Sequence, residues 1–346
     1  MQDGKPLLLT KYEVLIIGAG AGGSAAAIHC AQAGLKVALI ERQEFPRHRP
    51  GETLHPGIEP LLDQLGVGEQ IRAANFLRHE GNWVDWGEEQ GLMPFGSDKQ
   101  GIWRGFQVFR ADFDSILLDK AGELGVEIIQ PCRALGVLQE QGRVVRVKTS
   151  RGDIMAQVVI DAGGGFHWLT RQLKLAIPKF SQPQLVYYGY ATGECPARDQ
   201  YPAIVADEKG WTWTAKVSNH LYQWTRFPFK QTKLEPHWLP SEFAELKPQG
   251  AMLKADVTWR AVEQPAGKGY FVVGDAASVL DPASSHGVLK AIMSGIMAGH
   301  AISKILGSPQ LESSIIQEYS DWILNWFQQD LLKLKQFYQK SISYKL

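Results

Sequence analysis

The chain has 346 residues, of which 45% are hydrophobic, so it can form one large α/β unit or two closely connected domains. Its 36 basic residues balance 36 acidic residues, which excludes the basic excess typical of proteins that bind nucleic acid or anionic membranes. Three widely spaced cysteines argue against a disulfide framework and favour a reducing compartment. Because no apolar run has transmembrane length and no signal peptide is apparent, we expect a cytoplasmic protein without a membrane span.

The first predicted elements, within residues 12–42, form a nucleotide-binding unit of strand, glycine turn, helix and second strand. Gly18 permits the tight turn, Gly20 lets the backbone approach a pyrophosphate, and Gly23 lets the helix pack against the sheet. The second strand ends at Glu41, whose carboxylate suits a ribose 2′-hydroxyl and would repel a 2′-phosphate. This order predicts dinucleotide binding, against the alternative of a glycine-rich turn in an unrelated α/β protein.

The flanking segments are less regular. We expect residues 1–11 to form a loose leader, and residues 43–53 to form a loop that either wraps a phosphate-bearing ligand or is an ordinary surface loop. Apolar spacing predicts a helix over residues 56–72. Aromatic residues interleaved with glycine between 76 and 109 indicate strands and loops of a second domain, after which a helix capped by Asp112 is predicted.

The middle of the chain reads as strands. A strand is predicted at residues 126–129, and strands at 134–137, 144–149 and 154–160 form a meander. The last strand leads directly into a second glycine-rich turn at residues 161–165. This turn suggests a second close approach of the backbone to the same ligand.

The last part of the chain begins with an aromatic block at residues 180–263, whose alternation predicts an antiparallel sheet with one buried face. We expect this sheet to form a roof over the nucleotide-binding domain. An apolar strand then ends in Gly274-Asp275 and precedes a helix of small residues over 289–306. Residues 311–338 carry an apolar stripe at helical spacing, which is typical of core or partner packing.

Together these stretches resemble the superfamily of FAD-dependent monooxygenases, which includes aromatic hydroxylases, flavin-dependent halogenases and geranylgeranyl-reductase-like enzymes, and a branch that acts in tryptophylquinone biogenesis. The resemblance extends over about residues 12 to 305. Four motifs carry it: Gly18 to Gly23 with Glu41-Arg42; the loop from Phe45-Pro46-Arg47 to Gly51-Glu52-Thr53; Asp161 to Arg171; and Gly274 to Ala277 with Asp281-Pro282 and Gly287.

The resemblance implies an α/β fold with a Rossmann-like FAD-binding domain of the glutathione-reductase type, an inserted antiparallel β-sheet substrate domain and C-terminal helices. The FAD-binding domain would be discontinuous. The implied boundaries are 10–77, 110–175 and 265–308 for the FAD-binding domain, 78–109 and 176–264 for the substrate domain, and 309–346 for the C-terminal helices.

The resemblance also implies FAD as the cofactor and no metal site. Asp275 would contact the ribityl chain or pyrophosphate, the amides of residues 285–288 would face the flavin pyrimidine, and the backbone of Leu135 would contact adenine. The complete set of implied FAD-binding residues is Gly18, Gly20, Gly23, Glu41, Arg42, Arg110, Leu135, Gly163, Gly274, Asp275, Gly287 and Val288.

The function that the resemblance implies is oxygenation of an organic substrate, aromatic or protein-borne, through a flavin hydroperoxide. His286 and His79 are the candidates for acid–base catalysis, with the alternative that each is satisfied by backbone groups. The substrate would lie between the flavin and the aromatic sheet. Four tryptophans either form this wall or only pack the sheet: Trp83, Trp86, Trp211 and Trp213.

Departures from the family motifs narrow the chemistry. Halogenases of this superfamily carry a lysine where His79 stands, and their Trp-x-Trp-x-x-Pro signature has Lys216 in place of proline here, so a true halogenase is disfavoured. Gly164-Gly165 replaces the Asp-Gly pair of the hydroxylases, and no second GxGxxG motif is present. Electrons would therefore come from NAD(P)H either directly or, as these departures favour, through a separate flavin reductase.

Two other functions remain open at this point. The first is a flavin-dependent reductase of isoprenoid double bonds, which would need a long apolar tunnel. The second is a flavoprotein that acts on a partner protein, as in tryptophylquinone maturation, and docks through its C-terminal helices. The aromatic residues of that docking surface would be Trp322, Trp326 and Phe327.

Overall fold

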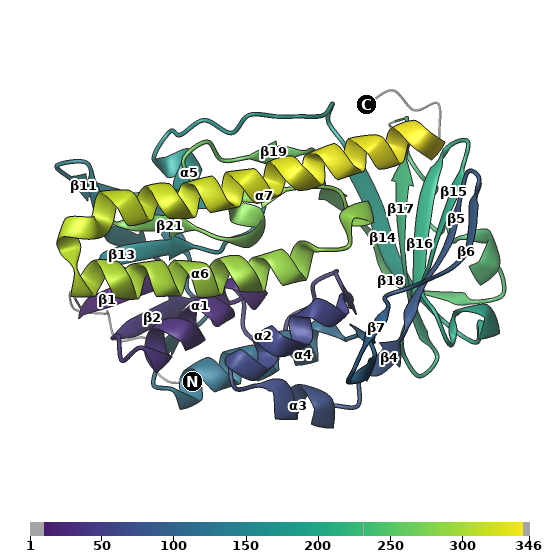
Figure 1. The fold of residues 1–346 in the computed structure, drawn as a ribbon, viewed down its shortest axis with the longest axis horizontal. Helices are drawn as coiled ribbons and strands as arrows, with labels where there is room; N and C mark the ends of the chain where they lie inside the picture. The colour runs from purple at the N-terminus through teal and green to yellow at the C-terminus, as the bar shows by residue number, and fades with distance from the viewer. Residues whose placement is uncertain (1–9, 231, 342–346) are drawn as a thin grey trace.

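The computed structural model describes residues 10–230 and 232–341. Within these ranges the chain forms two large sheets that stand side by side, with helices covering the first sheet and one long helix crossing to the second (Figure 1). The predicted leader falls mostly in residues 1–9, outside the described part, and the first strand already begins at Thr10. The end of the predicted C-terminal segment, residues 342–346, also lies outside it.

The first sheet is the expected nucleotide-binding sheet. Its path runs β10-β2-β1-β13-β12-β11, and β21, which pairs with β20, joins at β13. The pairs β10–β2, β2–β1, β1–β13 and β13–β21 are parallel, whereas β13–β12–β11 is the predicted antiparallel meander. The bounds are β1 Thr10–Ile17, β2 Val37–Ile40, β10 Glu127–Ile129, β11 Ala134–Glu140, β12 Arg143–Thr149, β13 Gly152–Asp161, β20 Ala266–Gly267 and β21 Tyr270–Val272.

Two helices pack closely on this sheet and on each other. They are α1 (Ala21–Gln32) and α6 (Gly287–Gly307). A Cβ atom added at Gly295 of α6 would lie 2.3 Å from the carbonyl oxygen of Gly22 in α1, so the two backbones touch with no room for a side chain. By length and composition alone α6 could cross a membrane, but half of its most apolar window is buried inside the protein, as in the core helix of a globular fold.

The helical segments between the two sheets differ from the prediction at their ends. The helix expected over residues 56–72 is broken by Gly66, whose φ of +72° ends α2, so the segment consists of η1 Pro56–Ile58, α2 Glu59–Gln64 and α3 Gly68–Ala73. The helix α4 (Arg110–Glu123) begins two residues before Asp112. Its N-cap position is Phe109, so the predicted cap at Asp112 is wrong.

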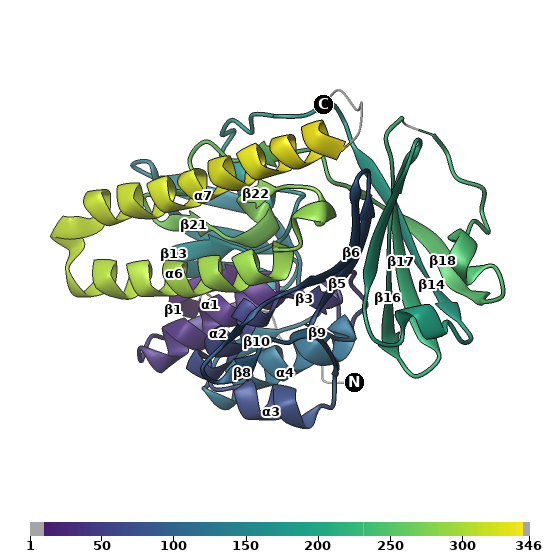
Figure 2. The same ribbon diagram turned by 45° about the vertical axis from the view of Figure 1, so that its right-hand side comes forward.

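The second sheet has seven strands in the order β18-β14-β17-β16-β15-β5-β6 (Figure 2). It is antiparallel except that β15 pairs with β5 in parallel. Residues 78–109, which we assigned to the substrate domain, contribute β5 and β6, but β4 and β9 pair instead with β3 beside the nucleotide domain. The bounds are β5 Gly81–Trp86, β6 Glu89–Pro94, β14 Leu185–Thr192, β15 Ala203–Asp207, β16 Gly210–Ser218, β17 Leu221–Pro228 and β18 Lys247–Asp256.

The long C-terminal helix α7 (Glu312–Ser341) ties the two halves together. It runs beside α6 and reaches the seven-stranded sheet with its last turns (Figure 1). Tyr319 and Ile323 are buried in the nucleotide-domain core, whereas Phe327 and Tyr338 are buried in a second core with the sheet. Phe327 is 2% exposed, so it cannot belong to the docking surface that we considered for this helix.

The remaining elements are short connections around the two sheets. They are β3 Thr53–Leu54, β4 Leu77–His79, β7 Ser97–Asp98, β8 Gly101–Ile102, β9 Gly105–Gln107, α5 Trp168–Gln172, η2 Pro196–Arg198, η3 Ser241–Phe243, β19 Arg260–Ala261, η4 Gly274–Ala276, β22 Ser278–Val279, η5 Pro282–Ser284 and η6 Pro309–Leu311.

Candidate active site

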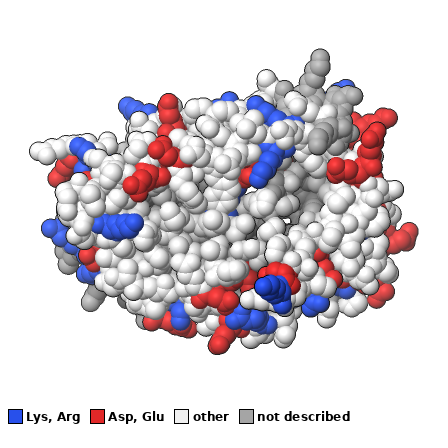
Figure 3. All heavy atoms as spheres, in the orientation of Figure 1, with Lys and Arg blue, Asp and Glu red and all other residues white. Residues whose placement is uncertain are grey.

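A cavity of about 1130 Å³ lies between the two sheets. It exceeds the roughly 300–1,000 Å³ of most ligand pockets, so it has room for a dinucleotide and a second molecule. One wall comes from the two glycine turns, the loop at residues 42–53 and the start of α6, and the opposite wall is a face of the seven-stranded sheet. Charges of both signs are interspersed on the outer surface, which is hollowed where the helices meet the sheet (Figure 3).

The first glycine turn has the geometry that the sequence predicted. Gly18 has a φ of +101°, and a Cβ atom at Gly23 would lie 1.9 Å from the carbonyl oxygen of Gly18. Gly20 is the N-cap residue of α1 and provides no side-chain cap, so the first amides of the helix are left for another acceptor. Gly20, Ala21 and the turn line the cavity, where these amides and the positive end of the helix favour an anion.

Glu41 closes the turn from the other side. Its Oε2 accepts a hydrogen bond from the amide of Ala19 at 2.9 Å, and its Oε1 accepts one from the amide of Gln43 at 3.1 Å. The side chain is buried yet lines the cavity, and Arg42 lines the cavity next to it. Glu41 is therefore held rigidly at the end of β2, where the sequence placed a contact to ribose.

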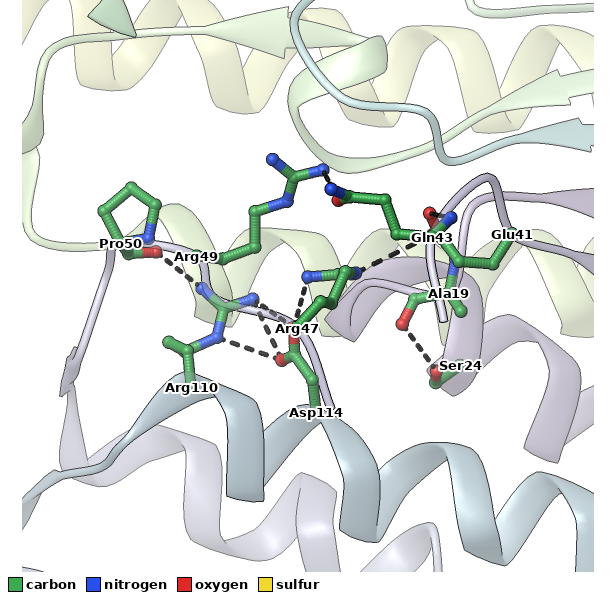
Figure 4. A network of polar contacts seen from close by, with 9 residues as sticks. All are labelled: Ala19, Ser24, Glu41, Gln43, Arg47, Arg49, Pro50, Arg110 and Asp114. Carbon is green, nitrogen blue, oxygen red and sulfur yellow. Dashed lines mark hydrogen bonds and ion pairs between the residues drawn. The ribbon is translucent and has the colours of Figure 1, made fainter. Parts of the chain in front are cut away.

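Two buried arginines share one buried carboxylate beneath the loop (Figure 4). Arg47 Nη1 donates to Asp114 Oδ2 at 3.2 Å, and Arg110 donates through Nε and Nη2 to both oxygens of Asp114 at 3.0 Å. Burial lowers the pKa of the Arg110 guanidinium, but Asp114 together with Glu52 and Asp275 raises it, and the net shift is upward. Arg110 also donates to the carbonyl of Pro50 and so anchors the loop to α4.

The second glycine turn is held by a buried carboxylate as well. Asp161 accepts hydrogen bonds from the amides of Gly163 and Leu169, both at 2.8 Å. Burial raises the pKa of Asp161 to about 6. Gly163 and the two glycines after it line the cavity, so this turn brings a second stretch of bare backbone to the ligand.

A histidine and an arginine connect this turn to β19, which follows the last strand of the seven-stranded sheet in the chain. Arg260 donates to His167 Nε2 at 2.8 Å and to the carbonyl of Gly165 at 2.9 Å. His167 Nδ1 lies 2.7 Å from the carbonyl oxygen of Ala276, so it carries the proton and the ring is neutral. Burial also lowers the pKa of His167. The side chain of His167 thus links the glycine turn to the Gly-Asp motif and, through Arg260, to β19.

The Gly-Asp motif places a carboxylate inside the cavity. Asp275 lines the cavity, and loss of hydration there raises the pKa of its carboxyl group, although Arg110 opposes the shift. Asp281 is fully buried in the wall and accepts from Trp259 Nε1 at 3.0 Å. Burial raises the pKa of Asp281 to about 6, and the hydroxyl of Tyr338 in α7 also hydrogen-bonds to it.

A third carboxyl group, Glu52, lies where the loop meets the sheet. It is 3% exposed and lines the cavity. The hydroxyl of Tyr190 in β14 donates to Glu52 Oε1, and the amide of Gly51 donates to Oε2 at 2.7 Å. Burial raises the pKa of Glu52, and the pKa of Tyr190 is raised for the same reason. Glu52 therefore fixes the loop to the substrate sheet.

The two histidines predicted as catalytic do not line this cavity. His79 is 3% exposed, with Nδ1 at 3.0 Å from the carbonyl oxygen of Gly81 and Nε2 at 3.3 Å from Gln107, as in the alternative that we considered for it. The His286 ring lies 5.4 Å from the ring of His55, outside the cavity lining. The catalytic roles of the two histidines therefore stay predictions, although Ser285 and Gly287 on either side of His286 do line the cavity.

The other predicted FAD residues fall around the cavity with one exception. Gly163, Gly274, Gly287 and Val288 line it, whereas the side chain of Leu135 is 59% exposed to solvent. The neighbouring residue Ala134 lines the cavity. The predicted contact of Leu135 is made by its backbone, so the exposure of its side chain leaves that contact a prediction.

Of the four tryptophans that were predicted as a possible substrate wall, two line the cavity and two do not. Trp211 and Trp213 of β16 line the cavity. Trp86 is fully buried against Phe337 on α7, and Trp83 on the same strand is 37% exposed. Only the first two can form a wall for a substrate, and Trp211 is further fixed by donating from Nε1 to the hydroxyl of Tyr338 at 2.8 Å.

Several residues that shape the site were not predicted. Asp114 follows Arg110 by four residues, a helical ion-pair spacing that sequence reasoning could have used. For His167 and Arg260 no such signal exists, because they are 93 residues apart and meet only through the fold. Glu52 lies in a motif that we quoted, but its carboxyl group was assigned no role.

The described residues fit FAD. The amides that begin α1 and α6 line the cavity, and neither helix has a side-chain cap. Among the described residues Arg47 Nε has no hydrogen-bond acceptor and only a longer ion-pair contact of 3.8 Å with Glu41 Oε2. A Cβ atom added at Gly20 would approach Arg47 Nη2 to 3.5 Å. A buried donor next to a bare glycine turn suits a pyrophosphate.

Comparison with known proteins agrees with this geometry. A protein-family model described as tryptophan halogenase matches residues 13–109 and 96–340. Tryptophan 2-halogenase of Chondromyces crocatus is 26% identical over 361 residues, covering 96% of this chain and 69% of that protein. A 1H-pyrrole-2-carbonyl-(peptidyl-carrier protein) brominase of Pseudoalteromonas luteoviolacea is 28% identical over 349 residues, covering 90% of this chain and 82% of that protein.

The fold is also found among solved structures. The myxobacterial chondrochloren halogenase, an FAD-dependent enzyme, superposes with a TM-score of 0.84 at 24% identity, over 96% of this chain and 83% of that chain. The predicted α/β fold with a Rossmann-like FAD sheet, a substrate sheet and a C-terminal helical segment is therefore confirmed, as is the resemblance to FAD-dependent monooxygenases and halogenases.

Proposed function

Because the chain belongs to the tryptophan halogenase family of FAD-dependent enzymes, we propose that it uses reduced FAD and dioxygen to oxygenate an aromatic substrate held against the seven-stranded sheet. One observation carries the choice of oxygenation over halogenation. Among the described residues that line the large cavity there are seven arginines and no lysine. The ammonium group that halogenases of this superfamily use has no counterpart there, and His79 in its place is buried behind the wall.

The chain's own residues would divide the work as follows. The start of α1, Arg47 and Glu41 would hold the ADP half of FAD, Asp275 would hold the ribityl chain, and the first amides of α6 would face the flavin. When bound, reduced FAD supplies two electrons and activates dioxygen, so that one oxygen atom enters the substrate and the other leaves as water. Trp211 and Trp213 would orient the substrate and keep bulk water out.

Protons for this chemistry would come from the carboxyl groups of the cavity rather than from histidine. Glu52 and Asp275 both line the cavity, and burial raises the pKa of each. A carboxyl group with a raised pKa is a better general acid near neutral pH than an exposed one. Glu52 is the stronger candidate, because the Tyr190 hydroxyl and the Gly51 amide hold it in one orientation.

Halogenation is the second candidate function. It is favoured by the printed activities of the relatives and by Lys290, which lines a small cavity of about 40 Å³ that shares Gly274, Asp275 and Gly287 with the large one. This ammonium is paired with Asp330 at 2.5 Å, which weighs against a free catalytic role. Reduction of an isoprenoid is less well supported, because the charged cavity wall does not form an apolar tunnel.

The proposal also covers the source of electrons and the cellular location of the protein. A separate flavin reductase using NAD(P)H would supply reduced FAD, since no second nucleotide motif is present. All three cysteines are free and buried, which supports a reducing, cytoplasmic setting. The substrate would be a small aromatic molecule or one carried by a protein, as the name of the carrier-protein brominase states for that relative.

Mass spectrometry of the product tests the choice between the two chemistries. The protein is loaded with FAD, supplied with a flavin reductase and NADH, and given indole, phenol or pyrrole in the presence of ¹⁸O₂ and bromide. We expect incorporation of one ¹⁸O atom and no bromine. A brominated product would overturn the proposal in favour of halogenation, and a protein that binds no FAD would overturn both. Omission of FAD provides the blank.

A further inference from the structure

The sheet wall of the cavity is mostly apolar and aromatic, and apart from Asp256 at the end of β18 and the hydroxyl of Tyr188 it carries two polar side chains. Gln223 and Thr225 lie two residues apart on β17, so both point to the same face of the sheet. They line the cavity but are only 3% and 8% exposed. A polar group that is buried in an apolar wall needs a hydrogen-bond partner, because leaving it unpaired costs about 1–3 kcal/mol.

The strand register places these two residues in the middle of the wall. Thr225 is directly opposite Tyr188 on β14 and Trp213 on β16, and both of these rings line the cavity. Gln223 is opposite Tyr190 on β14 and Ala215 on β16, and the small side chain of Ala215 does not cover the carboxamide from the β16 side. A flat molecule lying between the rings would therefore present its edge to Gln223 and Thr225.

The hydrogen bond between the two residues leaves one group unused. Gln223 Nε2 donates to Thr225 Oγ1 at 2.7 Å, which orients the carboxamide. In residues 10–230 and 232–341, no side chain or backbone group donates to Gln223 Oε1, which is not among the fully buried unpaired atoms and is therefore open to the cavity. The carboxamide oxygen of Gln223 can therefore accept a hydrogen bond from a ligand. It is not protonated at any ordinary pH, so it acts only as an acceptor.

We propose that Gln223, oriented by Thr225, determines substrate specificity by accepting a hydrogen bond from a ring N–H or O–H group of the aromatic substrate. This inference rests on the proposed function in one respect, namely that the substrate binds at the end of the cavity next to the seven-stranded sheet. A site that pairs with a substrate N–H rejects an analogue that lacks it, because the buried acceptor is then left unpaired. The same geometry disfavours ring oxygens, which repel an acceptor.

The test measures dissociation constants of indole and benzofuran for the FAD-loaded protein by titration calorimetry. The two probes have nearly the same shape, but only indole carries a donor. We expect indole to bind the unmodified protein about tenfold more tightly than benzofuran. Equal binding, tighter binding of benzofuran, or no binding of either probe up to its solubility limit would overturn the proposal.

Variants of Gln223 test whether this residue is the source of the preference for indole over benzofuran. Gln223→Met keeps the length but removes the acceptor, and should reduce the indole preference to within about twofold. Gln223→Glu retains an acceptor and should keep the preference, which guards against a mere packing defect. Gln139→Met, on an exposed position of β11, is the matched control and should change nothing. A preference that survives in Gln223→Met would also refute the assignment.

This experiment separates the inference from the proposed function. Binding of the probes does not depend on oxygenation, so a brominated product would leave the expected indole preference intact. Conversely, oxygenation of an aromatic substrate with equal affinity for indole and benzofuran would retain the proposed function and remove the role of Gln223.

Discussion

The two walls of the cavity reach the ligand by different means. On the nucleotide wall the backbone itself approaches, and a Cβ atom at Gly18 would lie 2.6 Å from the carbonyl oxygen of Ala162. On the sheet wall, side chains such as Trp213 and Gln223 fill the approach. The nucleotide wall therefore requires that its glycines carry no side chain, whereas the sheet wall requires the side chains that line it. Substitutions on the nucleotide wall should accordingly be the more damaging, and they should act through folding and cofactor binding together.

Gly23→Ala should show the largest effect. Its Cβ atom would lie 1.9 Å from the oxygen of Gly18 and 3.0 Å from Ala162 Cβ, neither of which can move without separating α1 from β1. We expect loss of bound FAD and a protein that is unfolded or strongly destabilised, measured by flavin absorbance and circular dichroism. The control is Gly307→Ala at the end of α6, where no atom lies within 4 Å of the added Cβ. Normal FAD content in Gly23→Ala would contradict the close approach.

Asp114→Asn tests the charged support beneath the nucleotide wall. It leaves two buried guanidinium groups, Arg47 and Arg110, without their shared counter-ion, which should cost about 3–5 kcal/mol of unfolding free energy. The half-exposed pair Arg146–Asp153 provides the contrast, since Asp153→Asn should cost less than about 1 kcal/mol. Urea denaturation of both variants measures the difference. Equal, small losses would mean that the arginines find other partners.

The same contrast explains what could be predicted from the sequence. The glycine turn and Glu41 were predicted because their roles follow from local backbone geometry and the order of strand, turn and helix, whereas the role of Asp275 was implied by the resemblance to the family. His79 and His286 were chosen by motif position, but the direction of each side chain also depends on neighbours from other segments, here Gln107 for His79 and His55 for His286.

On the sheet wall the sequence predicted the alternation of the strands but not their partners. Alternation alone could not distinguish Trp211, which faces the cavity, from Trp86, which packs under α7. The contact of Arg260 with His167 joins two segments whose relative position is set by tertiary packing. No spacing rule covers such a pair, so the polar network between the walls had to be seen in the structure.

Tyr338→Phe tests the connection of α7 to both walls. The hydroxyl accepts from Trp211 Nε1 and hydrogen-bonds with Asp281, so its removal leaves a buried indole N–H without an acceptor. We expect a loss of about 1–3 kcal/mol in unfolding free energy. Leu332→Ala, 60% exposed on the same helix, should change stability by less than about 0.5 kcal/mol. Equal stabilities of the two variants would show that α7 packs on the sheet without this anchor.

Asp281→Asn should have the smallest effect, and it should depend on pH. Burial raises the pKa of Asp281 to about 6, above the range of a carboxyl group in an unfolded chain, so the folded protein binds the extra proton. The stability contribution of that proton is complete below about pH 4 and is lost as the pH rises through 6. The amide mimics the protonated acid at every pH. The melting temperature of the variant relative to the unmodified protein should therefore rise between pH 4 and pH 7, by about 2 °C.

The control is Asp119→Asn, exposed on α4, which should show no such trend with pH. A relative melting temperature that falls with pH would mean that the ionised carboxylate, held by Trp259 and the Ala283 amide, is the stabilising form.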